Sequence, residues 1–298
     1  MPVMKLGVLF LIGPDGTRLE HSGGCVHSIA GRRRPHPPRL VPTINTAEHV
    51  FMKIRRFKVD DLTGPIVTVG GSEAGHALRV LRLKTGAEVV LFDGLGQQVT
   101  GRVCSVAQHS FEVEITRRYG VDPAQGASLV IASATPKGNR GDWLVEKCAE
   151  LGVRELWLLR TERGEVLPGE SKIARWRRKG VEAAKQTGHA ITMEIKPPRT
   201  IADAAAGAAD MTILYADPVR SGHTLIEALQ TLPTARTHRP KVLIFIGPEG
   251  GFTEDECAEI EHAGGQSVRL SDGILRIETA AVAAASIWGA WAAMSRAE

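Results

Sequence analysis

Acidic and basic side chains stand beside two glycine-rich turns near the carboxyl end of the chain. Glu249 lies within the first turn, residues 247–251, and Arg276 and Glu278 follow the second turn, residues 271–273. A carboxylate can take a proton from a reacting group, and a guanidinium can stabilise the anion that develops as the proton leaves. The three side chains are therefore candidates for acid–base chemistry at one site.

These residues also have a structural interpretation, which the sequence leaves open. Glu249 precedes a helix that is expected to start near Thr253, and the helix dipole favours a carboxylate at that end. Arg276 and Glu278 are two residues apart and can form an ion pair with each other.

The two turns follow segments that have the pattern of strands. Residues 242–246 form a continuous apolar run, which is typical of a strand buried on both faces of a parallel sheet. A helix is expected to begin at Thr253, with Glu256 as its capping-box partner, and to end at glycines 264 and 265. A second strand is expected over residues 267–270. Because ligands bind at strand ends in an open α/β sheet, we expect a binding site at these turns.

The glycine-rich turns do not match a known phosphate-binding loop. No lysine follows the first turn as in a P-loop, and the G-x-G-x-x-G pattern is absent. Bare backbone instead allows the close approach of a flat and mostly uncharged group such as adenine. The alternative is a tight turn between strand and helix that binds no ligand.

The composition is that of an ordinary soluble globular protein, with 43% hydrophobic and 23% charged residues. A length of 298 residues suits two domains or one large one. The four cysteines lie far apart with no C-x-x-C pair, which indicates a reducing compartment and argues against a zinc site. The net charge of +4 favours nucleic-acid binding only weakly, so an RNA contact must depend on local clusters of basic residues.

Residues 1–51 differ in composition from the rest of the chain. Three consecutive arginines, residues 32–34, precede a proline-rich stretch, so an extended and poorly ordered segment is expected. The apolar run 6–12 is too short to span a membrane, and no signal-peptide cleavage site follows it. We expect either a disordered extension or a mis-assigned start, with Met52 as the first residue of the protein.

Two patterns of elements divide the remainder of the chain. Residues 52–122 have the pattern of short strands with one helix, expected over residues 72–83, and regularly spaced short strands indicate a small β-barrel. A loop between residues 119 and 127 marks the boundary, after which strands and helices alternate as in an α/β sheet. The strands expected there are residues 129–132, 155–160, 191–195, 212–215, 242–246 and 267–270, and the longer helices are residues 142–151, 172–187 and 279–294.

Basic side chains gather in the first of these domains and at a few positions in the second. They are candidates for contacts with RNA phosphates, which position a nucleic acid without reading its sequence. The alternative is an ordinary solvated surface. The candidates are Arg55, Arg56, Lys58, His76, Arg79, Arg82, Lys137, Arg140 and His189.

Several segments together resemble a known family. The stretches IGPEGGFTEDE and LSDGILRIETAA, which start at residues 246 and 270, resemble the signature of the SPOUT superfamily of knotted methyltransferases. More narrowly, they resemble the ribosomal RNA small subunit methyltransferase E family. Further similar segments are residues 76–86, 143–152, 161–163 and 182–188, and the resemblance extends from about Met52 to Ala293.

The resemblance implies a protein of the α/β class, with a C-terminal α/β trefoil-knot (SPOUT) methyltransferase domain in residues 127–298 and an N-terminal PUA-like RNA-binding β-barrel in residues 52–122. It implies a cytoplasmic homodimer that uses S-adenosyl-L-methionine to methylate N3 of a uridine in 16S rRNA, within the assembled small ribosomal subunit. No metal ion and no membrane are implied. The residues implied to line the cofactor pocket are Leu214, Ala216, Ile246, Gly247, Gly250, Gly251, Leu270, Ser271, Gly273, Ile274 and Leu275.

In such an enzyme, Arg276 is expected to stabilise the anion on the uracil carbonyls, and Glu249 to take the N3 proton with Glu278 behind it. The chain departs from the family pattern at two places, where Asp272-Gly273 replaces Pro-Arg and His189 replaces an arginine. Both departures bear on substrate contacts more than on cofactor binding. Two alternatives stay open, namely methylation of another RNA base and a ribosome-binding module without catalysis.

Overall fold

The computed structural model describes residues 54–120, 128–220, 222–233 and 240–295. The expectations for residues 1–51, and for Met52 as the first residue, lie outside the described residues. Most of the predicted boundary loop, residues 121–127, also lies outside them.

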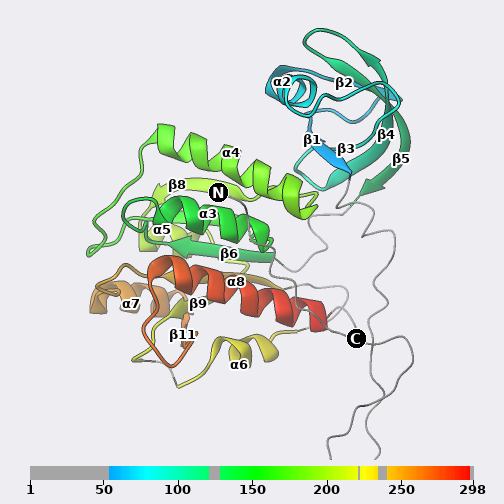
Figure 1. Cartoon of the computed structure of the whole chain (residues 1–298). Coiled ribbons are helices and arrows are strands. Elements are labelled where there is room, and N and C mark those ends of the chain that lie inside the picture. The colour runs from blue at the N-terminus through cyan, green and yellow to red at the C-terminus, as the bar shows by residue number, and fades with distance from the viewer. Residues whose placement is uncertain (1–53, 121–127, 221, 234–239, 296–298) are drawn as a thin grey trace, which may run out of the picture. The chain divides into compact units, whose positions relative to one another are not determined.

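The first part of the chain forms a five-stranded sheet with the order β1-β3-β4-β5-β2 (Figure 1). Strands β1 and β3 are parallel, and the other neighbouring strands are antiparallel. One helix, α2, accompanies the sheet. Their bounds are β1 Arg55–Lys58, β2 Ile66–Val69, α2 Gly71–Arg79, β3 Glu88–Phe92, β4 Gln97–Val106 and β5 Phe111–Gly120.

Alternating side chains give this sheet one buried face. Phe111 and Val113 in β5 are buried, whereas Glu114 is exposed. The ring of Phe111 meets that of Phe57 edge-on at 5.2 Å between centroids. The register of β4 with β5 shifts next to Gly101, where an added Cβ would lie 2.5 Å from the Glu114 carbonyl oxygen. Glycine therefore permits the close approach that this irregularity requires.

The second part forms a six-stranded sheet with the order β11-β9-β10-β6-β7-β8, in which every neighbouring pair is parallel. Its central strands are buried along nearly their whole length, as expected for a parallel sheet covered on both faces. Its strands are β6 Ser128–Ser133, β7 Glu155–Leu159, β8 Glu194–Arg199, β9 Thr212–Ala216, β10 Lys241–Ile246 and β11 Gln266–Val268.

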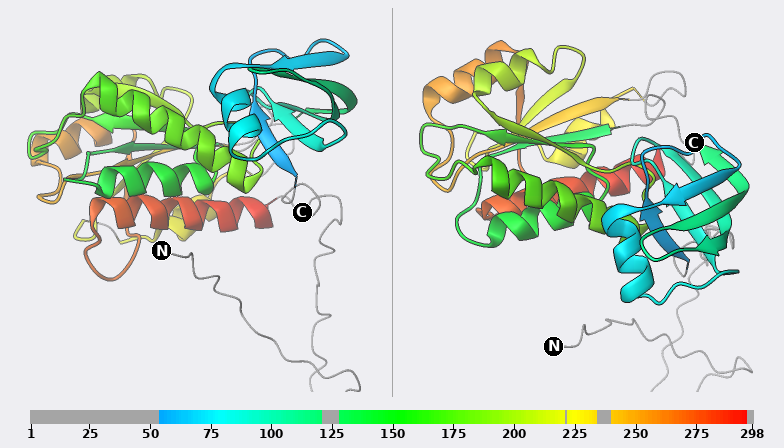
Figure 2. Two further views of the ribbon diagram at one scale, coloured as in Figure 1. Left: turned by 45° about the horizontal axis from the view of Figure 1, so that its top comes forward. Right: turned by 90° about the horizontal axis from the view of Figure 1, so that it is seen from above.

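Helices cover both faces of this sheet, and each face has its own hydrophobic cluster. Helices α3, α4, α6 and α8 contribute to one cluster, and α5 and α7 contribute to the other. The right panel of Figure 2 shows α3, α4 and α8 on one side of the sheet. The helix bounds are α3 Arg140–Glu150, α4 Glu170–Thr187, α5 Ile201–Ala206, α6 Leu225–Gln230, α7 Glu254–His262 and α8 Ile277–Met294.

Among the described helices, α8 alone is long and apolar enough, by length and composition, to cross a membrane. Half of it is buried, and it packs against α3, α6, β6 and β10, as expected for a helix in a protein core. The described residues contain no group of three or more His, Cys, Asp or Glu side chains that could hold a metal ion.

Local sequence patterns predicted the positions of most of the helices and strands. The predicted capping box of α7 is confirmed, because the Thr253 hydroxyl accepts from the Glu256 amide at 3.2 Å and the Glu256 carboxylate accepts from the Thr253 amide at 2.9 Å. The strand predicted at residues 191–195 is wrong in position, because β8 spans Glu194–Arg199. This strand includes two prolines, which an edge strand tolerates because it need not donate to a neighbour on its outer side.

Candidate functional site

Three adjacent parallel strands end at the same level of the second sheet. Ala216, the last residue of β9, pairs with Val268, the last residue of β11, and Phe245 of β10 pairs with Tyr215 of β9. The loops that follow the three strands meet around a cavity of about 410 Å³. The sheet order thus brings together segments that lie up to about sixty residues apart in the chain.

The cavity is lined by all the residues predicted to bind the cofactor except Leu214. That side chain is 1% exposed and packs in the hydrophobic cluster under α8. The predicted residues that line the cavity are Ala216, Ile246, Gly247, Gly250, Gly251, Leu270, Ser271, Gly273, Ile274 and Leu275.

The loop after β9 contributes residues that were not predicted. Asp217, Pro218, Val219 and Arg220 also line the cavity. This loop lacks the glycine signature of the other two, and only the position of β9 between β11 and β10 brings it to the site.

Glycines shape the cavity wall in two ways. At Gly247 an added Cβ would lie 3.2 Å from the ring of Phe252, so this glycine allows the turn to pack closely on its own protein. At Gly251 and Gly273 an added Cβ would meet nothing within 4 Å. These two positions therefore face open space, and Gly251 also needs glycine for its φ of +69°.

Arg163, in the loop after β7, holds the first glycine-rich turn. Its Nη1 donates to the carbonyl oxygens of Gly250 at 2.8 Å and Phe252 at 3.4 Å. The adjacent Glu162 amide donates to the Glu256 carboxylate at 2.8 Å. The sequence placed no functional role on Arg163, because the contact joins residues 87 positions apart.

An ion pair spans the rim of the cavity from the loop after β9 to the start of α7. Arg220 donates to the Glu254 carboxylate and lies 3.6 Å from Asp217. The hydrogen bond with Arg220 lowers the pKa of Glu254 below its usual value, and the same bond raises the pKa of Arg220. These charges therefore keep their opposite signs at neutral pH.

The two candidate carboxylates share one cation, Arg140. Glu249 lines the cavity, and its Oε1 lies 3.4 Å from Nη2 of Arg140. The Glu278 side chain is only 9% exposed, and its Oε1 lies 3.6 Å from Nη1 of Arg140. Among the described ion pairs, Glu278 therefore contacts Arg140 and not Arg276.

The alternative role of Glu249 as a helix cap is not what the structure shows, because Thr253 occupies the cap position of α7. Arg276 is exposed and is the residue immediately before α8. Arg276 does not appear in the cavity wall, although its neighbours Leu275 and Ile277 do.

The basic candidates of the first sheet differ in exposure. Arg55, His76, Arg79 and Arg82 are exposed, and Lys58 forms an ion pair with Asp60 at 3.3 Å. These side chains are accessible to a charged partner.

Arg56 is buried and has protein partners. Its Nη2 donates to Oε1 of Gln98 at 3.2 Å, and its guanidinium lies 5.0 Å from the centre of the Phe92 ring. Burial lowers the pKa of Arg56 to about 10, so the side chain is still positively charged at neutral pH.

The basic candidates of the second domain also have protein partners. Lys137 pairs with Glu165 at 2.5 Å, and Nε2 of His189 lies 3.1 Å from the Glu150 carbonyl oxygen. Arg140 contacts the two carboxylates described above. A cluster of basic residues in the sequence thus does not show which of them already pair with groups of the protein itself.

Two family models match the chain. The model of an RNA methyltransferase domain matches residues 124–289, and the model of an RNA methyltransferase PUA domain matches residues 69–116. The first match covers the second sheet and all three cavity loops, and the second lies within the first sheet and α2.

Relatives and solved structures agree with this division. The chain is 27% identical over 242 residues to ribosomal RNA small subunit methyltransferase E from Mycobacterium bovis, covering 76% of this chain and 88% of the relative. It is 23% identical over 246 residues to the protein of the same name from Bacillus subtilis, covering 80% and 94%. The crystal structure of a ribosomal RNA small subunit methyltransferase E from Neisseria gonorrhoeae, bound to S-adenosyl methionine, is 27% identical and superposes with a TM-score of 0.68, covering 78% of this chain and 95% of that one. With more than half of its length matched by the family model, the chain belongs to the RNA methyltransferase family.

Proposed function

We propose that this protein is an S-adenosylmethionine-dependent methyltransferase that methylates N3 of a uridine in small-subunit ribosomal RNA. The observation that carries the proposal is the cavity at the ends of β9, β10 and β11, which is lined by both glycine-rich turns. Further support comes from the names of the curated relatives and from the similar gonococcal structure with bound S-adenosyl methionine.

The residues around the cavity fit this cofactor. A volume of about 410 Å³ is ordinary for a small-molecule site. Ile246, Leu270 and Leu275 provide an apolar wall for a flat ring, and Gly251 and Gly273 leave backbone accessible beside it. When bound, the cofactor supplies an electrophilic methyl group on a positively charged sulfur.

The residues of this chain would manage the proton and the charge of the uracil. Its N3 carries a proton that must leave as the methyl group arrives, and we assign the removal of that proton to Glu249, which lines the cavity. Arg276, exposed at the start of α8, is assigned to stabilise the negative charge on the flanking carbonyl oxygens. Glu278, which is buried and pairs with the same Arg140 as Glu249, is assigned a supporting role.

We propose the finer features of the fold on the same grounds. They are a trefoil knot formed by the cavity loops in a methyltransferase domain of residues 127–298, and a PUA-like barrel in residues 52–122. We also propose a homodimer located in the cytoplasm that acts on the assembled small ribosomal subunit. The aligned strand ends support one site formed by the cavity loops, and the two family matches support the two domains. The dimer, its location and the assembled subunit as substrate are proposed from the family resemblance alone.

For the RNA surface we propose the exposed and partly exposed basic side chains of the first domain, together with Lys137 and His189 in the second domain. Phosphate contacts need an accessible cation, so the buried Arg56 is left out of this surface. The proposed contacts in the first domain are Arg55, Lys58, His76, Arg79 and Arg82.

Methyl transfer to small ribosomal subunits from a strain that lacks this gene tests the proposed function. We expect the purified protein to transfer a labelled methyl group from S-adenosylmethionine to these subunits. The product should stop primer extension at one uridine, because an N3 methyl group blocks Watson–Crick pairing.

Three other outcomes are informative. Transfer to naked rRNA or tRNA but not to subunits would indicate a different RNA target. A labelled base other than uridine would contradict the assigned nitrogen. Binding to subunits with no transfer and no thermal shift on addition of S-adenosylmethionine would favour a ribosome-binding module without catalysis.

A further inference from the structure

Arg140 joins three segments of the second domain at the edge of the cavity. It is the first residue of α3, and its two terminal nitrogens face carboxylates from two other segments. Nη2 lies 3.4 Å from Glu249, in the loop after β10, and Nη1 lies 3.6 Å from Glu278, in the first turn of α8. One guanidinium thus connects both carboxylates of the proposed site.

Glu278 needs such a partner because it is buried. Its side chain is 9% exposed, and its Oε2 has no hydrogen-bond partner among the described residues. A buried carboxylate without a cation is strongly unfavourable. Among the described ion pairs, Arg140 supplies the one cation for Glu278.

Glu249 needs a partner for a different reason. Its side chain is 47% exposed, so solvent alone would leave it free to change its rotamer. A guanidinium that is already directed at Glu278 limits the orientations that the Glu249 carboxylate can adopt. A fixed carboxylate is better placed to take a proton at a defined point of the cavity.

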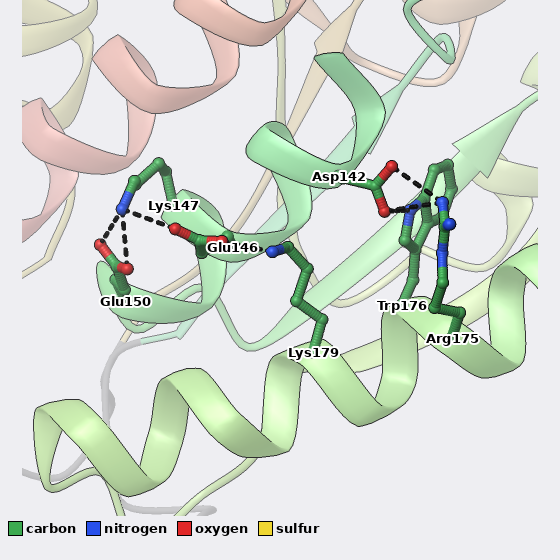
Figure 3. A network of polar contacts seen from close by, with 7 residues as sticks. All are labelled: Asp142, Glu146, Lys147, Glu150, Arg175, Trp176 and Lys179. Atoms are coloured by element: carbon green, nitrogen blue, oxygen red, sulfur yellow. Dashed lines mark hydrogen bonds and ion pairs between the residues drawn. The ribbon is translucent and has the colours of Figure 1, made fainter. Parts of the chain in front are cut away.

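The helix that carries Arg140 is fixed in place by contacts with its neighbour. Helix α3 is joined to α4 by a network of charged contacts, shown in Figure 3. Asp142 accepts from Arg175 at 2.8 Å and from the indole nitrogen of Trp176 at 3.0 Å, and Glu146 accepts from Lys179. Nε of Arg140 also donates to the Lys137 carbonyl oxygen at 3.3 Å.

We propose that Arg140 is a positioning residue, which sets the orientation of Glu249 and provides the counter-charge of Glu278, and is not a contact for RNA phosphates. The kinetic part of this inference rests on the proposed function, in which Glu249 takes the proton from the base. The pairing with Glu278 does not depend on that function.

A kinetic double-mutant cycle tests the first part, with Arg140→Gln, Glu249→Gln and the double variant assayed for methyl transfer to small subunits. We expect Arg140→Gln to lower kcat by about tenfold or more, because small misplacements of a reacting group are costly, and to leave KM for the subunits unchanged. In the Glu249→Gln background the same change should have little further effect, since it acts through Glu249. Arg140→Lys should recover part of the lost kcat.

A stability cycle tests the second part without any enzymatic assay. We expect Arg140→Gln to lower Tm by roughly 4 °C, because it leaves the Glu278 carboxylate buried without a cation. The same change in a Glu278→Gln background should lower Tm much less. Lys241→Gln, which removes an exposed ion pair with Asp210 at the other end of β10, is the control and should change neither kcat nor Tm.

The two parts can fail separately. If wild-type protein transfers no methyl group, the proposed function is wrong, and the stability cycle alone decides whether Arg140 pairs with Glu278. If wild-type protein is active but Arg140→Gln raises KM, weakens the salt dependence of RNA binding and adds fully to Glu249→Gln, then Arg140 contacts phosphates and the inference is overturned. Equal Tm losses in both Glu278 backgrounds would overturn the pairing.

Discussion

Glycine at position 273 illustrates how a single residue can affect binding without affecting the fold. The residue lines the cavity, and an added Cβ would meet nothing within 4 Å in the protein. Gly265, by contrast, would place a Cβ 2.7 Å from the carbonyl oxygen of Ile260, so a side chain there must disturb the backbone. A substitution at Gly273 can therefore change ligand binding without disturbing the fold, whereas a substitution at Gly265 cannot.

We expect Gly273→Val to weaken S-adenosylmethionine binding by about threefold, because valine holds two γ-carbons beside the cavity. The arginine that the family pattern has at this position can instead direct its single γ-carbon away from the cofactor. The Tm of the variant without cofactor should stay close to that of the wild type. Calorimetric titration with the cofactor and thermal unfolding measure the two quantities. Gly70→Val, at another open position in the first domain, is the control, and equal cofactor affinity in both variants would contradict a ligand at residue 273.

The charges around the cavity show where sequence reasoning at the residue scale is limited. Arg140 stands near Lys137 and was grouped with it as a phosphate contact, yet its partners Glu249 and Glu278 are more than a hundred residues away. Nothing in the local sequence distinguishes an engaged arginine from a free one, because the partner belongs to a different element.

At the scale of elements, helix α3 depends on its charged contacts with α4. The hydrogen bond from Lys179, and then that from Lys147, lower the pKa of Glu146 from its ordinary value of 4.5. A carboxyl whose pKa is lowered by folding stabilises the protein above its unfolded pKa, and this contribution is lost as the pH falls through its folded pKa. The stabilisation from Glu146 is thus present at neutral pH and disappears in acid.

Replacement of Glu146 by Gln should lower Tm at pH 7 by a small amount, equivalent to less than about 1 kcal/mol because the contact is partly exposed. The difference in Tm from the wild type should shrink as the pH is lowered below 4.5, and it should vanish once the pH is below the lowered pKa of Glu146. Thermal unfolding across this range measures it. Glu88→Gln, which removes a more exposed ion pair with Arg102, serves as the comparison. If the difference in Tm between the wild type and Glu146→Gln grew in acid, the pairing of Glu146 with the two lysines would be contradicted.

Elements with a strong local signal were predicted closely, and those with weak signals were not. The run 242–246 lies within β10, and the capping box at Thr253 starts α7 as expected. Helices α5 and α6 were not predicted, although Thr200 and Thr224 form capping boxes before them. Each helix has only six residues, too few for the helical repeat of apolar residues to be recognised.

At the scale of the whole molecule, the chain combines a sheet that carries exposed basic residues with a sheet that carries the cavity. The first lies within the PUA match and the second within the methyltransferase match. If the first domain holds RNA by its phosphates, its cations should govern affinity and not the chemical step.

Arg79→Gln and Arg82→Gln together should weaken binding to small subunits and reduce the slope of log K against log salt by about two, one for each lost phosphate contact. Methyl transfer at saturating subunits should be unchanged. Filter binding at several salt concentrations and initial rates measure the two effects. Lys241→Gln, which removes one exposed cation from the second domain, is the control and should leave the salt slope unchanged. An unchanged salt slope in the double variant would remove these two arginines from the RNA surface.

The sequence by itself determined the class of the fold and the presence of two kinds of domain, and its resemblance to the family placed all but one of the predicted cofactor-binding residues correctly in the cavity wall. The fold class and the domains follow from local patterns, since apolar runs, capping boxes and glycine turns depend on neighbours in the chain, whereas the cavity residues follow from the family resemblance. The tertiary structure alone decided that the loop after β9 joins the other two, that Leu214 lies in the core and that Arg140 faces Glu249 and Glu278. Those features depend on the order of strands in the sheet and on contacts between distant segments, which no local pattern encodes.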